Sequence, residues 1–135
     1  MPAEIVAIAD NCGLLRRINP QLHVIPDKNT GQRRLSSGAF RDPRMSVDAE
    51  CLLIALGKTH SFSLRGYENF YLVRIRAGFA RGHGQQVEHR PIVGNDFHTE
   101  VIGKKPQPIC RALRDNAEWV VPPGGIGQAK LAATD

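Results

Sequence analysis

With 135 residues, the chain is long enough to form one domain with a hydrophobic core. Its apolar content of 41% and charged content of 23% are ordinary for a globular protein and exclude wholesale disorder. A formal net charge of +5 favours anionic partners, namely nucleic acid, nucleotide phosphates, acidic proteins or a membrane surface.

Two further observations concern membranes and targeting. The longest apolar run, Cys51–Leu56, is too short to span a bilayer. Residues 1–10 lack a basic segment followed by an apolar one, so no signal peptide is predicted. We therefore expect a cytoplasmic protein without a membrane partner.

The cysteines are Cys12, Cys51 and Cys110, an odd number at wide spacing and without a C-x-x-C pair. This pattern disfavours both a disulfide framework and a zinc knuckle. It predicts free and mostly buried thiols in a reducing compartment.

The first third of the chain predicts a hairpin preceded by two short segments. Pro2–Asp10 fits either a short helix, with proline at the first helical position, or a strand. The short segment Leu14–Ile18 follows and ends at an Asn-Pro turn. Leu22–Ile25 and Gln32–Leu35 flank a run of turn-forming residues, which predicts a β-hairpin.

A helix is predicted in the middle of the chain. The segment Ser37–Met45 is irregular, and Ser46 then occupies a position typical of an N-cap. Apolar residues recur at helical spacing over Val47–Leu56, and Gly57 follows at the stop position.

The second half of the chain predicts two strands and a second helix. Apolar and polar residues alternate over Phe70–Arg76 and over Phe97–Ile102, as in half-buried strands. Pro108–Glu118 has helical spacing. The polar segment Lys58–Glu68 is expected to be a loop, and the glycine-rich Gly78–Gln86 either a loop or a bulged strand.

These elements predict a single α+β domain over residues 1–123, with a mostly antiparallel sheet packed by two helices. Trp119–Val121 fits a short last strand. Residues 124–135 are small, polar or glycine-rich, so a flexible tail is expected. The residues expected in the core are Leu52, Ile54, Val73, Val101 and Leu113.

A basic, serine-containing segment is the first candidate site. Guanidinium groups bind phosphate oxygens bidentately, and hydroxyls and free backbone N–H groups complete such a site. The same residues also fit a solvated basic loop whose serines satisfy turns. The candidates in this segment are Arg33, Arg34, Ser36, Ser37, Arg41 and, further along, Arg44.

His98 and Glu100 form the second candidate. Two residues apart on a strand, they point to the same face, as an acid–base pair requires. Ser36 is a further candidate for a catalytic role. No helical His-x-x-x-His spacing is present, so neither a metal nor a cofactor is predicted, and an ordinary hydrogen-bonded histidine is the alternative.

The third candidate is the basic strand. Arg74 and Arg76 share one face, with Tyr71 close in sequence, and such a face can neutralise and stack single-stranded nucleic acid. The alternative is a charged outer face of a half-buried sheet.

Several runs of the sequence together resemble a known pattern. They are LLRRI, HVIPDKNTGQRRLSSGAF, MSVD, FHTEVIGKK and AEWVVPP. The chain thereby resembles a family of small bacterial proteins of unassigned function, and the resemblance implies no activity. A strand arginine followed by a serine-containing strand also resembles the layout of ADP-ribosyltransferases, but the glutamate motif of that family has no counterpart.

Three functions follow from these patterns. The first is a small basic module that binds nucleic acid or a phosphate-bearing ligand. The second is a small enzyme, a nuclease or a nucleotide-directed transferase, that uses His98 with Glu100, or Ser36. The third is an accessory subunit that binds another protein.

Overall fold

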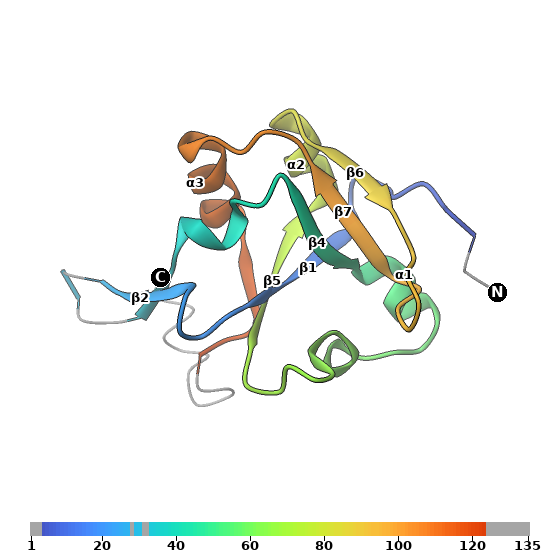
Figure 1. The fold of residues 1–135 in the computed structure, drawn as a ribbon, viewed down its shortest axis with the longest axis horizontal. Coiled ribbons are helices and arrows are strands. Elements are labelled where there is room, and N and C mark those ends of the chain that lie inside the picture. Colours follow the sequence, from blue (N-terminus) through green and yellow to red (C-terminus); the bar gives the residue numbers. More distant parts are fainter. Residues whose placement is uncertain (1–3, 28, 31–32, 124–135) are drawn as a thin grey trace.

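The computed structural model describes residues 4–27, 29–30 and 33–123. A six-stranded antiparallel sheet has the order β6-β7-β4-β1-β5-β8, and β2 and β3 form a separate hairpin (Figure 1). The strands are β1 (Gly13–Ile18), β2 (Val24–Pro26), β3 (Arg33–Leu35), β4 (Arg44–Ala49), β5 (Tyr71–Arg76), β6 (Gln86–His89), β7 (His98–Ile102) and β8 (Glu118–Val121). The helices are α1 (Glu50–Ala55), α2 (Ala77–Gly82), α3 (Gln107–Asn116) and the 3-10 helices η1 (Ser37–Phe40) and η2 (His60–Leu64).

The central strand β1 is covered on both faces. Leu14 and Ile18 belong to the larger core cluster, whereas Leu15 belongs to the smaller one. Because successive side chains of a strand point to opposite faces, Arg16 lies on the side of the larger cluster and Arg17 on the other. The larger cluster also contains buried residues of η1, α2 and α3, and the smaller one is covered by α1 and η2.

The fold class is confirmed: antiparallel strands pack against helices in one α+β domain. The strand predictions for Phe70–Arg76, Phe97–Ile102 and Trp119–Val121 correspond to β5, β7 and β8. The predicted hairpin corresponds to β2 and β3, and α3 matches the predicted second helix. The predicted tail lies outside the described residues.

The prediction of a helix over Val47–Leu56 with Ser46 as its N-cap is wrong in its first half. Ser46 lies in β4, opposite Glu100 of β7, and the helix begins only at Glu50. β4 pairs with strands on both sides, and these ladders override the local capping signal. In the short helix that remains, Ile54 is 58% exposed, so its assignment to the core is also wrong.

The prediction of a loop or a bulged strand for the glycine-rich segment Gly78–Gln86 is wrong for its first five residues. These residues form most of α2, and Gly84 with φ of 80° separates that helix from β6. Residues 4–10 form neither the helix nor the strand considered for Pro2–Asp10. Within the described residues, no helix combines the length and apolarity that a membrane crossing requires.

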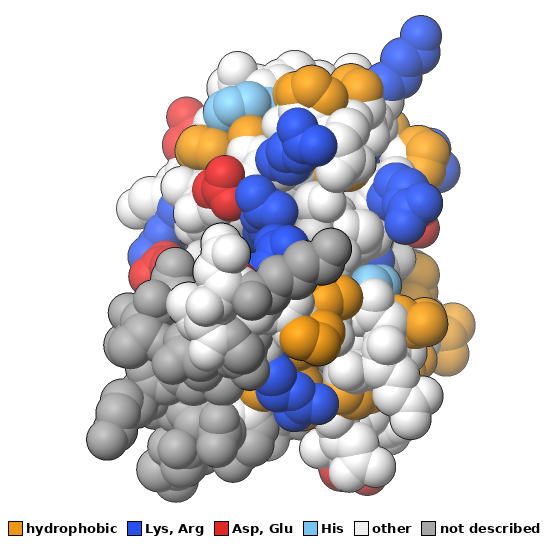
Figure 2. Space-filling view, turned by 90° about the vertical axis from the view of Figure 1, so that its left-hand side faces the viewer, with side chains coloured by type: hydrophobic (Ala, Val, Ile, Leu, Met, Phe, Trp, Pro, Cys, Tyr) orange, Lys and Arg blue, Asp and Glu red, His pale blue; other side chains and the backbone are white. Residues whose placement is uncertain are grey.

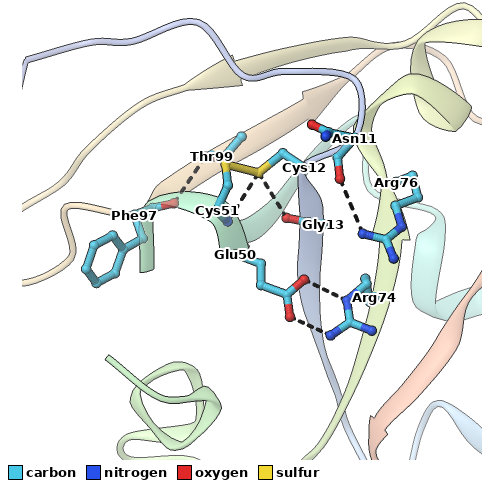
Figure 3. The surroundings of a disulfide bond; sticks show 9 residues. All are labelled: Asn11, Cys12, Gly13, Glu50, Cys51, Arg74, Arg76, Phe97 and Thr99. Carbon is cyan, nitrogen blue, oxygen red and sulfur yellow. Dashed lines mark hydrogen bonds and ion pairs between the residues drawn. A yellow bond between two sulfur atoms is a disulfide. The ribbon is translucent and has the colours of Figure 1, made fainter. Parts of the chain in front are cut away.

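Cys12 and Cys51 form a disulfide, with 2.15 Å between the sulfurs (Figure 3). The prediction of free thiols is therefore wrong for these two residues and right for Cys110, which is free and buried. The spacing rule failed because β1 and β4 are neighbours, which places the ends of the two strands side by side. Because these two cysteines are paired, they no longer support the expectation of a reducing compartment.

We expect loss of the disulfide to destabilise the protein markedly. The bridge spans 39 positions, and loop-closure entropy predicts about 4 kcal/mol for a loop of that length. Urea unfolding of Cys12→Ser/Cys51→Ser against the oxidised wild type measures the loss. A reductant should lower the wild-type midpoint and leave that of the variant unchanged. An unchanged wild-type midpoint in reductant would contradict the assignment.

Candidate anion-binding site

The site is built on η1, which follows directly from the hairpin. Ser36 caps this turn, because its Oγ accepts a hydrogen bond from the N–H of Gly38 at 3.1 Å. The N–H of Ser36 donates to the carbonyl of His23 at 2.8 Å, which ties β3 to the residue before β2. Ala39 and Phe40 are fully buried and anchor the turn on the sheet.

Arg16 lies on β1 beneath this turn. Its Nε donates to the carbonyl of Ala39 at 3.1 Å, and its Nη1 donates to the carbonyl of Ser46 at 3.0 Å. The side chain is half-buried, and it makes no ion pair with a carboxylate in the described part of the chain. Burial lowers the pKa of Arg16, and the charge of Asp42 opposes this shift. A desolvated guanidinium is thus held in place, and its hydrogen bonds to the described residues use two of its five N–H groups.

His23 is the second hydrogen-bond donor of the site. Its Nδ1 accepts a hydrogen bond from the N–H of Asn19 at 3.1 Å, so the neutral ring carries its proton on Nε2. Burial lowers the pKa of His23, and the charges of Arg16 and Arg41 lower it further. The ring therefore offers a neutral N–H donor inside a positive field.

Arg41 extends back over η1. Its Nη2 lies 3.2 Å from the point where a Cβ on Gly38 would be, so the missing side chain of that glycine leaves room for the guanidinium. Arg44, the alternative arginine for this position, instead pairs with Glu100 at 2.7 Å.

The structure places the other residues of the basic segment differently. Ser37 Oγ accepts from Nε2 of Gln107 at 3.0 Å, which connects η1 to α3. Arg33 and Arg34 point to opposite sides of β3, and Arg33 lies 3.5 Å from the hydroxyl of Tyr71. Figure 2 shows the side of the molecule with α3 and the hairpin, where lysines and arginines outnumber acidic side chains.

Arg74 and Arg76 do not join this site. Arg74 binds the buried carboxylate of Glu50 with two of its nitrogens (Figure 3), and this hydrogen bonding lowers the pKa of Glu50. His60 contacts the same carboxylate at 2.6 Å. Arg76 donates to the carbonyl of Asn11 and lies 3.7 Å from Glu118. The charges of both arginines are already compensated within the fold.

His98 and Glu100 share one side of β7, but each has a structural partner. His98 Nδ1 donates to the carbonyl of Arg90 at 2.8 Å, and its Nε2 then accepts from Ser46 Oγ at 3.2 Å. Glu100 pairs with Arg44. Ser36 makes none of these contacts, so the structure does not assemble the three catalytic candidates into one site. In the described ranges, no group of three His, Cys, Asp or Glu residues suits a metal ion.

The site residues predicted from the sequence did not include Arg16, His23 or the buried Lys105. Lys105 Nζ donates to the carbonyl oxygens of Val101, Gly103 and Pro43, the first at 2.7 Å. It joins the end of β7 to the loop before β4. Burial lowers the pKa of Lys105 to about 8. In the sequence, Lys105 follows Lys104, and such a pair of lysines resembles an ordinary surface charge.

The shifted pKa predicts a pH dependence of stability. Between about pH 8 and 10.5, the unfolded chain holds more protons on Lys105 than the folded one, so this residue makes the free energy of unfolding rise with pH. Denaturant titrations across this range for wild type and Lys105→Met should show the rise only in the wild type. The exposed neighbour provides the control, because Lys104→Met should keep the wild-type profile. An identical slope in Lys105→Met would contradict the assignment.

Comparison of the chain with protein-family models, curated proteins and solved structures finds no match.

Proposed function

We propose that the protein is a binding module for a phosphate-bearing ligand, held between Arg16, His23, Ser36 and Arg41. The observation that carries this proposal is the half-buried guanidinium of Arg16, which is fixed by two carbonyl oxygens and has no carboxylate partner among the described residues. Desolvating a cation without neutralising it costs free energy. The charge of Asp42 offsets part of that cost, and an anionic ligand would offset more of it.

The donors available match the oxygens of a phosphate group. Arg16 has five N–H groups and uses one at Nε and one at Nη1. His23 offers its Nε2–H, and the hydroxyl of Ser36 accepts from Gly38 while its own proton remains available. Arg41 adds a solvent-exposed guanidinium above the turn. Planar guanidinium forks bind phosphate bidentately, so this set favours phosphate over a halide.

A binding role is favoured over catalysis because the residues considered for acid–base chemistry are engaged elsewhere. His98 has a hydrogen-bond partner on each ring nitrogen, and Glu100 is neutralised by Arg44. Among the described residues, the hydroxyl of Ser36 is hydrogen-bonded to the N–H of Gly38 and to no histidine or carboxylate that could activate it.

The proposal is tested by titrating the protein with inorganic phosphate and with a mononucleotide while the His23 ring is followed by NMR. Wild type should bind both, more weakly at higher salt, and the His23 resonance should shift. Arg41→Gln should weaken binding and also raise the pKa of His23, since a neighbouring positive charge is removed. Arg16→Gln should weaken binding further.

Arg114→Gln is the matched control, because Arg114 pairs with its neighbour Asp115 and is absent from the site. It removes one positive charge without touching the proposed contacts. Absence of phosphate binding by wild type at low salt, or equal binding by Arg41→Gln and Arg114→Gln, would overturn the proposal.

A further inference from the structure

The segment around η2 carries two arginine–aromatic stacks on the side of the sheet away from the anion-binding site. The Cζ of Arg65 lies 3.7 Å from the centre of the Phe62 ring, and the Cζ of Arg17 lies 4.2 Å from that of Tyr67. Lys58 Nζ lies 6.0 Å from the Phe62 ring on the same segment. We refer to these five residues as the stacking surface.

Backbone carbonyls, rather than carboxylates, hold the two arginines in place. Arg65 donates to the carbonyl of Phe62 at 3.2 Å and to that of Gly94 at 2.9 Å. Arg17 donates to the carbonyl of Ser63 at 3.2 Å. Within the ranges that the structure describes, neither arginine makes an ion pair with a carboxylate. Their positive charges are therefore fixed in position and not neutralised.

Each stack has one exposed member, and further aromatic contacts hold both rings in place. Tyr67 is 41% exposed and meets Phe70 edge-on at 5.1 Å, and Arg65 and Lys58 are exposed. Phe62 packs edge-on against the buried Phe97 at 5.0 Å, which fixes the ring beneath Arg65. The guanidinium of Arg65 therefore lies over a fixed ring on an exposed side chain.

We propose that the stacking surface binds single-stranded nucleic acid. Flat cationic planes and exposed aromatic rings are the groups on which unpaired bases stack, and fixed positive charges beside them attract the phosphates between those bases. Duplex nucleic acid fits less well, because its bases are already stacked on one another. The one acidic side chain of this segment is the exposed Glu68, which leaves the balance of charge positive.

This surface is independent of the proposed phosphate site. Arg16 and Arg17 are consecutive on β1 and point to opposite faces of the sheet, so each surface has one of them. Arg74, on the strand that the sequence suggested for nucleic acid, shares the sheet face of Arg17 but is occupied by Glu50 and is not part of the stacking surface.

The test is fluorescence anisotropy of a labelled oligothymidylate, with a duplex of equal length and with heparin as competitors. Wild type should prefer the single strand and bind it more weakly at higher salt. Tyr67→Leu and Arg65→Lys should each weaken binding by roughly tenfold, since loss of one base stack has an effect of that order. Arg65→Lys is informative because it keeps the charge and removes the plane.

Arg114→Gln serves as the control and should bind the oligonucleotide like wild type, because Arg114 pairs with Asp115 and belongs to neither site. Unchanged unfolding midpoints establish that the variants are folded. Equal binding of duplex and single strand, wild-type binding by Arg65→Lys, or no binding at low salt would each overturn the inference. Binding of inorganic phosphate, followed on His23, reports on the other site separately, so failure of one proposal is distinguishable from failure of the other.

Discussion

Replacing Phe40 with alanine is expected to lower the free energy of unfolding by about 3–5 kcal/mol. The ring is fully buried in the larger core cluster, and its removal leaves a cavity between η1 and the sheet. The residue before it, Ala39, supplies the carbonyl that holds Arg16. We therefore also expect phosphate binding to weaken, even under conditions in which the variant is folded.

Urea titration at neutral pH measures the stability loss. Val93→Ala is the control, because Val93 is fully exposed and its truncation should change the free energy of unfolding by less than about 0.5 kcal/mol. A loss below about 1 kcal/mol for Phe40→Ala would show that η1 is not anchored as described.

The second large effect is expected for Glu50→Gln. Glu50 is buried, and its carboxylate compensates the positive charge of Arg74. The side chain of Arg74 is 20% exposed. Removing one partner of a buried ion pair costs about 3–5 kcal/mol, and the residual exposure of Arg74 favours the lower end. Glutamine preserves the shape of the side chain, so the loss reports on charge. Glu118→Gln, at a carboxylate whose side chain is 56% exposed, should have little effect.

The pH dependence of this loss has a defined sign. The hydrogen bonds from Arg74 lower the pKa of Glu50 below its ordinary value of 4.5. The stabilisation is therefore present above the unfolded-state pKa and disappears as the pH falls through the lower, folded-state value. The difference between wild type and Glu50→Gln should shrink in acid. A difference that is constant down to the acid transition would contradict the ion pair.

Long alternating segments of the sequence predicted their structure correctly, and short ambiguous ones did not. β5 and β7 show a clean two-residue period, and α3 is long enough for a helical period to be visible. The run from Met45 to Ala49 also alternates, with three fully or nearly buried apolar residues, but a serine at a cap position favoured a helix. This run forms a strand because it pairs with β1 on one side and β7 on the other, and the local sequence does not reveal these two partners.

The candidate site was predicted only in part, for a related reason. Ser36 and Arg41 follow from a local basic run, and the turn between them brings them together. Arg16 lies inside an apolar segment and His23 at the start of the hairpin, so their convergence depends on how the hairpin packs over the sheet. The disulfide likewise depends on strand order, which cysteine spacing does not reveal.

The Cys12–Cys51 bridge also has a consequence for cleavage of the backbone. It closes a covalent ring from residue 12 to residue 51, and Arg16, His23, Ser36 and Arg41 all belong to that ring. A protease that cuts once within the β2–β3 hairpin would therefore open the ring without releasing a fragment. Every ligand-binding group of the site would remain part of one covalent molecule, and two nicks between these cysteines would be needed to remove any of them.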